Sequence, residues 1–159
     1  MIVILDASTL INLANGEVFA KIVSMAEHEF FVGAVVDQES RTVARAVLAA
    51  VTRGDIQRID DNTIDADAFQ AAVDTWGLGA GETECLLAAT ALGCSIACDD
   101  GAARRVIERE VGAASLTGSV GLLRQAVQAG VLSSDEAFAA YERMKRRGGY
   151  LPDIPRTGF

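Results

Sequence analysis

The chain has 159 residues, of which 14 are basic and 22 acidic, so its formal net charge at pH 7 is −8. This length is typical of one domain. Half of the residues are hydrophobic and only two are proline, which excludes a disordered chain and leaves ample material for a core. The acidic balance excludes a protein that holds nucleic acid by a basic surface alone.

The N-terminal residues indicate where the protein is located, and the cysteines indicate which kinds of site are disfavoured. The start MIVILDASTL lacks a basic leader, and no segment approaches the roughly 20 apolar residues of a membrane span. We therefore expect a cytoplasmic protein with no membrane partner. The three cysteines form no CxxC pattern and His28 is the only histidine, which argues against a zinc site, a disulfide framework and a histidine-based catalytic triad.

Short β-branched runs alternate with stretches of helical periodicity along the chain. The first run, residues 2–5, ends at Asp6, as a buried parallel strand does when a site follows its carboxyl end. Further strands are predicted at residues 30–36, 56–59 and 95–98. Helices are predicted at residues 8–15, 37–51, 63–76, 82–92, 100–110, 119–131 and 133–147, with a loop at 77–81 and an irregular tail from 147.

This alternation predicts a single α/β domain over residues 1–159 with a mostly parallel sheet. The helices from about residue 118 belong to the same domain. Two local features are specific enough to test. Helix 37–51 has an apolar face formed by Val43, Val47, Leu48 and Val51, and Ser134 introduces the last helix with a carboxylate in its first turn.

Acidic residues recur where the predicted strands end. Asp6 closes the first strand, Glu39 opens the helix after the second, Glu84 begins the helix after residues 77–81, and Asp99 and Asp100 close the strand 95–98. The carboxyl ends of parallel strands meet at one edge of a sheet, where ligands bind. Clustered carboxylates repel one another unless a cation lies between them, and hard oxygen ligands favour Mg²⁺ or Mn²⁺.

Several of these acids have a second interpretation. Asp6, Glu39 and Glu84 could instead cap or polarise the helices that follow them. Glu82 and Glu84 point in different directions on one helix, so one of them is expected to face the metal. Of Asp99 and Asp100, one would bind metal while the other caps the next helix, and we favour Asp100 as the ligand.

Two further groups of residues remain open between a functional and a structural role. Ser8 either orients the Asp6 carboxylate, or a metal-bound water, or caps the helix that it begins. Phosphate contacts are expected from basic residues near Asp100 and in the C-terminal segment, or these residues form a solvated helix end. They are Arg104, Arg105, Lys145, Arg146 and Arg147, the last three within a stretch, residues 143–159, that has five basic residues against the single Asp153.

Four motifs together resemble a PIN-domain protein of the VapC-like type. LDASTLINLA resembles the opening of that family, and VVDQES, ETECLLAATALG and IACDD resemble the segments with its second, third and fourth acids. The resemblance covers residues 1–109 and implies a three-layer α/β/α sandwich. It also implies a Mg²⁺- or Mn²⁺-dependent endoribonuclease, commonly the toxin of a toxin–antitoxin pair, that acts on RNA as a homodimer and binds an antitoxin protein.

Carried over motif by motif, the resemblance assigns roles to single residues. The catalytic acids would be Asp6, Glu39, Glu84 and Asp100, with Asp6, Glu84, Asp100 and Asp99 as metal ligands and Ser8 supporting them. Glu84 stands where the family more often has Asp, which leaves Glu82 as a substitute.

Three other classes of protein are alternatives to this hypothesis. An interaction module would keep the fold but bind a protein or nucleic acid without cleavage. A phosphotransferase of the haloacid-dehalogenase kind is disfavoured because Ser8 stands where that family needs a second Asp. A two-component receiver is disfavoured because the only lysines are Lys21 and Lys145, neither in the expected context.

Overall fold

The computed structural model of the protein describes residues 1–35, 43–60 and 62–159. Its centre is a five-stranded sheet in the order β3-β2-β1-β4-β5, and every neighbouring pair of strands is parallel. The strands are β1 (Ile2–Leu5), β2 (Glu29–Val32), β3 (Ile56–Arg58), β4 (Ser95–Ala97) and β5 (Leu116–Thr117). The prediction of a parallel α/β sheet is therefore confirmed.

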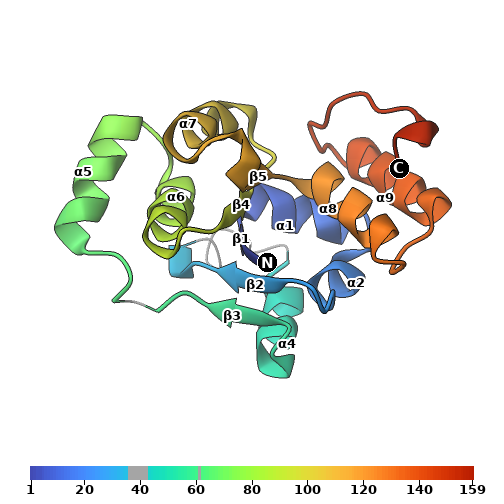
Figure 1. Cartoon of the computed structure of the whole chain (residues 1–159), viewed down its shortest axis with the longest axis horizontal. Helices are drawn as coiled ribbons and strands as arrows, with labels where there is room; N and C mark the ends of the chain where they lie inside the picture. The colour runs from blue at the N-terminus through green and yellow to red at the C-terminus, as the bar shows by residue number, and fades with distance from the viewer. Residues whose placement is uncertain (36–42, 61) are drawn as a thin grey trace.

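Helices cover both faces of this sheet (Figure 1). One layer contains α5 (Ala66–Trp76), α6 (Ala80–Leu92) and α7 (Gly101–Val111). The other contains α1 (Ala7–Asn15), α2 (Phe19–Val23), α4 (Ala44–Arg53), α8 (Ser119–Gln128) and α9 (Ser134–Arg146), while short 3₁₀ turns occupy Ala113–Ser115 and Arg156–Gly158. The molecule is a three-layer α/β/α sandwich, as the family resemblance implies. No helix in the described part of the chain is long and apolar enough to cross a membrane.

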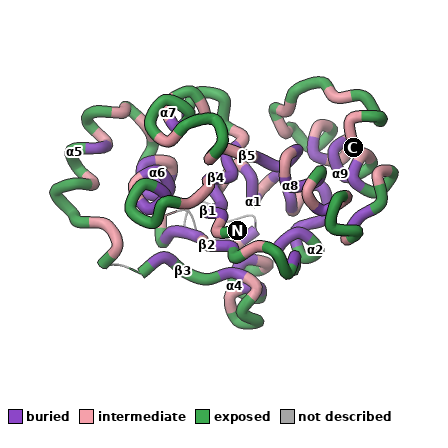
Figure 2. The backbone as a smooth tube through the Cα atoms, viewed as in Figure 1, coloured by how far each residue is buried: buried purple, intermediate pink, exposed green. Residues whose placement is uncertain are grey.

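The core lies where the central strands meet these layers (Figure 2). Val3, Ile4 and Leu5 of β1 are at most 1% exposed, which is the burial expected of a parallel strand covered on both faces. Helix α6 packs on β1 and β4 and is buried over much of its length because small residues such as Ala88 and Ala89 line it. Strand β1 is therefore buried between the two helical layers.

Most predicted elements are confirmed, with differences at their boundaries. Helix α5 ends at Gly77, whose φ of 61° is easily adopted only without a side chain. Helix α6 begins at Ala80, inside the segment predicted as a loop. Strand β5 was not predicted, since its two residues are too few for a periodic signal.

The strand predicted at residues 30–36 ends at Val32 instead. Two of the backbone N–H groups that follow are not paired with a neighbouring strand. Ala34 N and Val35 N instead donate hydrogen bonds to the Glu84 carboxylate. The apolar face predicted for the following helix is also partly wrong. Val47 is fully buried, but Leu48 is 57% exposed.

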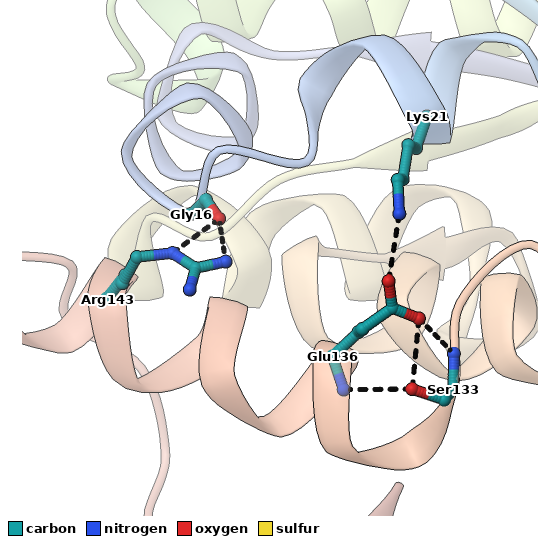
Figure 3. Close-up of polar contacts among 5 residues, drawn as sticks. All are labelled: Gly16, Lys21, Ser133, Glu136 and Arg143. Atoms are coloured by element: carbon teal, nitrogen blue, oxygen red, sulfur yellow. Dashed lines mark hydrogen bonds and ion pairs between the residues drawn. The ribbon is translucent and has the colours of Figure 1, made fainter.

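Helix α9 is attached to the N-terminal part of the chain at both of its ends (Figure 3). At its start, Ser133 and Glu136 form a capping box, and Glu136 also pairs with Lys21 of α2 at 3.0 Å. These contacts lower the pKa of Glu136 to about 2, chiefly through the hydrogen bond from the Ser133 backbone. Near its end, the Arg143 guanidinium donates two hydrogen bonds to the Gly16 carbonyl. The cap is thus Ser133 and not the predicted Ser134.

Substitution of the cap tests this assignment. Ser133→Ala removes the side-chain acceptor for Glu136 N, so we expect the free energy of unfolding to fall by about 1 kcal/mol. Ser134→Ala is the matched control and should change it by less than about 0.5 kcal/mol. Urea unfolding of the two variants measures both values, and a larger loss for Ser134→Ala would show that the cap is assigned wrongly.

Candidate functional site

The site lies at the carboxyl edge of the sheet, where Asp6 follows β1. Asp6 N donates to the carbonyl of Ala97 at 3.0 Å, so the residue still belongs to the pairing of β1 with β4. Its carboxylate caps α1 by accepting from Ser8 N at 3.1 Å and from Ser8 Oγ at 2.5 Å. Asp6 is 3% exposed, and a carboxylate this deeply buried needs such partners or a cation.

Ser8 connects the ends of two strands. Its hydroxyl donates to Asp6 Oδ2 and accepts a 2.9 Å hydrogen bond from the backbone N–H of Asp99. Of the two roles left open for Ser8, the structure shows the one that orients Asp6, since the cap of α1 is Asp6 itself. One hydroxyl group therefore sets the position of the β4 end relative to the Asp6 carboxylate.

The Asp99 carboxylate is held between two helices of one layer. Asn12 Nδ2 of α1 donates to it at 2.8 Å, and Ser119 of α8 donates both its backbone N–H, at 2.9 Å, and its hydroxyl. A Cβ at Gly118 would collide with this carboxylate. The glycine after β5 thus leaves the space that Asp99 fills.

Asp100 points elsewhere. Its Oδ1 accepts from Ala102 N at 2.9 Å and from Ala103 N at 2.8 Å, which caps α7, and the residue is exposed. In the structure Asp100 is the N-cap of α7, whereas the sequence favoured Asp100 as the metal ligand. The reason is positional, because Asp100 directly precedes α7 and Asp99 faces α1 and α8. A metal-binding role for Asp100 stays a prediction.

Glu84 reaches the same edge from α6. It is 9% exposed, and its two oxygens accept from Ala34 N at 2.9 Å and Val35 N at 3.0 Å. Gly33, which follows β2, has no side chain, and a Cβ there would overlap the Glu84 carboxylate. Glu82 lies instead against Gly79 at the start of its own helix. Of the two acids, Glu84 is the one directed toward the sheet.

The negative charges of these acids affect the pKa values of two buried thiols. Burial raises the pKa of Cys85 well above its usual value, and the nearby charges of Asp6 and Glu84 raise it further. Burial also raises the pKa of Cys98, again with a contribution from Asp6. Asp6 and Glu84 therefore act on one buried position although they belong to different elements.

The donor chemistry fits a hard divalent cation, but the described residues do not form a complete cage. Within residues 1–35, 43–60 and 62–159, no three Asp, Glu, His or Cys side chains lie close enough together to hold a metal. Mg²⁺ commonly uses one or two carboxylates together with water and phosphate oxygens, so Asp6 with a neighbouring acid supplies a suitable ligand type. Glu39, the second predicted acid, lies outside the described residues.

The predicted phosphate-binding residues have mostly structural contacts. Arg104 Nη1 donates to the carbonyls of Cys98 and Thr117, both at 2.6 Å, and so ties the ends of β4 and β5. Lys145 pairs with Asp153. Arg147 donates to Asn15 O at 2.8 Å and to Glu17 Oε1 at 2.7 Å, while Arg105 and Arg146 are exposed. Their binding to RNA stays a prediction.

Sequence reasoning missed Asn12, Ser119 and the two glycines at the strand ends. Asn12 is four residues after Ser8 and therefore on the same face of α1, and an asparagine inside a predicted helix is a sequence signal of a specific partner. Ser119 could not be found because the strand before it was not predicted. Gly33 was read as part of a strand, although a glycine there signals a close approach.

This geometry defines an α/β protein with acidic residues at the carboxyl edge of a parallel sheet. A family model described as a PIN domain, DUF3368, matches residues 2–154. The chain therefore belongs to the PIN-domain family, whose members are typically nucleases and generally use divalent metals. No curated protein and no solved structure gives a significant match.

The bridging role of Ser8 can be tested through stability. Ser8→Ala removes the donor to Asp6 and the acceptor for Asp99 N, so we expect the free energy of unfolding to fall by about 1–3 kcal/mol. Ser24→Ala is the control, because Ser24 is exposed and its hydroxyl donates to the nearby Lys21 carbonyl, and its effect should be below about 0.5 kcal/mol. Equal stabilities of the two variants in urea would argue against the bridge.

Thiol reactivity tests the field around the buried cysteines. Cys94 is partly exposed, while burial raises the pKa values of Cys85 and Cys98 and nearby acids raise them further. Because the thiolate is the reactive form, we expect iodoacetamide to alkylate Cys94 first in the folded protein and all three after unfolding. Peptide mass mapping of a time course measures the order, and early labelling of Cys85 would contradict it.

Proposed function

We propose that this chain is a metal-dependent endoribonuclease that hydrolyses phosphodiester bonds in RNA. The observation that carries the proposal is the Asp6 carboxylate, which is buried at the end of β1 and held by the Ser8 hydroxyl beside Asp99. An acid of this kind is costly to bury without a cation, and in a family of nucleases it marks the reaction centre. Asp6 is therefore assigned as the central ligand.

The candidate ligands come from four regions of the chain. They are Asp6, Glu39, Glu84, and Asp99 or Asp100, with Mg²⁺ or Mn²⁺ as the cation. When bound, such an ion activates water for attack and neutralises the charge that develops on the phosphate. No histidine base is needed for this chemistry, which agrees with the position of His28, stacked on Phe30 of β2 and bonded to Gln125 of α8.

The protein's own part is to hold these carboxylates in place before substrate arrives. Ser8 donates two hydrogen bonds to one oxygen of Asp6 and so fixes the orientation of the Asp6 carboxylate. Asn12 and Ser119 do the same for Asp99. Fixed carboxylates need no reorganisation during the reaction, which is the main way in which such sites lower a barrier.

The resemblance to VapC-like proteins supports a more specific biological role. We infer that the chain is the toxin of a toxin–antitoxin pair, acts in the cytoplasm, forms a homodimer, and is inhibited by an antitoxin protein. A net charge of −8 repels RNA at long range. Bound metal ions and the cations of a second subunit would offset this repulsion.

One observation favours the alternative of an interaction module. Both oxygens of Glu84 already accept hydrogen bonds from the protein, as do both oxygens of Asp99. A site whose acids are satisfied internally would bind metal weakly, and the fold would then serve to bind a protein partner or nucleic acid without cleavage. The experiment below separates the two functions.

Cleavage of a mixed pool of RNAs in Mg²⁺, in Mn²⁺ and in EDTA tests the proposal. We expect cleavage that requires metal and that falls at least about 100-fold in Asp6→Asn, because the amide cannot replace a charged metal ligand. Asp65→Asn is the matched control. Asp65 caps α5 as Asp6 caps α1, asparagine is an equally good cap, and activity should remain.

The outcomes distinguish the two functions. Cleavage lost in Asp6→Asn and retained in Asp65→Asn supports the nuclease. Cleavage that persists in EDTA or in Asp6→Asn overturns the assignment of Asp6. A folded wild-type protein that cleaves no RNA with either metal overturns the nuclease and favours the interaction module.

A further inference from the structure

Three pockets next to the site share two residues. The first, of about 300 Å³, lies beside β5 and includes Arg104 and Arg124. The second, of about 200 Å³, includes Ser8 and Asn12, and the third, of about 650 Å³, includes Lys145. Asp99 and Tyr150 line all three. Tyr150 thus borders each of these pockets together with Asp99.

Tyr150 is 93% exposed, although the segment that carries it is firmly attached. Before it, Gly149 N donates to Met144 O at 2.9 Å. After it, the Tyr141 hydroxyl donates to Pro152 O at 2.7 Å and accepts from Ile154 N at 3.0 Å. The aromatic ring therefore projects from a fixed backbone and is not part of a loose end.

The backbone before Tyr150 lies directly against the site. A Cβ at Gly149 would come within 2.6 Å of Asn12 Oδ1, and the amide nitrogen of the same Asn12 holds Asp99. Glycine at this position allows the tail to pass this close. Tyr150 therefore directly follows a backbone position that lies against Asn12, the residue that donates to Asp99.

Positive charge lies in the first of these pockets, which Arg104 and Arg124 line. In the third pocket, Lys145 is paired with Asp153. Arg124 is exposed and lies 5.9 Å from the Phe159 ring centre, and its Nε donates to Gly158 O. Cations attract the phosphates of a strand, and an exposed aromatic face binds its bases by stacking.

We propose that Tyr150 is a stacking platform for an unpaired base of a single-stranded RNA bound beside Asp99. The inference rests on the proposed nuclease function and names a substrate-positioning residue of the same site. A base within a duplex is already stacked on its neighbours, whereas a base in a single strand or a loop is free to stack on a side chain. Tyr150 is a positioning residue, and its phenol takes no part in the reaction.

The test compares Tyr150→Ala with Tyr150→Phe in cleavage of an unstructured RNA. Loss of one base stack should raise KM by about 5- to 100-fold and leave kcat within about twofold. Tyr150→Phe keeps the ring and should restore KM. Leu48→Ala is the control, since Leu48 is an exposed apolar side chain on α4, and all variants should melt at the wild-type temperature.

Equilibrium binding separates this inference from the proposed function. Anisotropy of a labelled single-stranded RNA and of its duplex is measured with Ca²⁺ and with EDTA. Tighter binding of the single strand that is lost in Tyr150→Ala and kept in Tyr150→Phe supports the platform, even if no RNA is cleaved. The stacking platform is overturned if the wild type and Tyr150→Ala bind the single strand equally. It is also overturned if the wild type prefers the duplex or binds no RNA, even if cleavage is observed. Tyr150→Ala that instead lowers kcat at unchanged KM also overturns it.

Discussion

The hydroxyl group of Ser8 is the contact on which the geometry of the acidic edge depends. It donates to the carboxylate that ends β1 and accepts from the backbone that follows β4. Parallel strands are joined only by slanted backbone hydrogen bonds, and these stop where the strands stop. Beyond that point the segments that follow β1 and β4 diverge into α1 and α7. A side chain then has to set the distance between these two segments. Ser8 does so with one short link in each direction.

Two glycines explain why acids from other elements can approach this edge. Gly33 follows β2 and Gly118 follows β5, and a Cβ at either position would overlap a carboxylate, that of Glu84 or that of Asp99. The sheet therefore ends in glycine on both sides of the central β1–β4 pair. The missing side chains let a glutamate from α6 and the aspartate that follows β4 lie close to the backbone, where N–H groups satisfy their charge.

How much the sequence predicts depends on whether the controlling interaction is local. The strand β1 and the possible cap at Asp6 follow from short-range patterns, and the family motifs place Glu84 near the edge. The role of Ser119 could not be predicted, because its partner is 20 residues away and the strand between them is only two residues long. The different surroundings of Asp99 and Asp100 could not be predicted for a related reason. Both follow the same strand, and only the packing of α1 and α8 shows which of them faces inward.

The hydrogen bonds from Ser119 to Asp99 also determine when the site can form during synthesis. Asp6 and Ser8 leave the ribosome among the first residues, but Asp99 stays without two of its three donors until α8 has been made. Chains grow at about 5–20 residues per second, so seconds separate the first acid from the last residue that fixes the arrangement. A nascent chain therefore exposes its acids to the translation machinery before it holds them in a working geometry. For a protein that would cut RNA, this order delays activity until the chain is nearly complete.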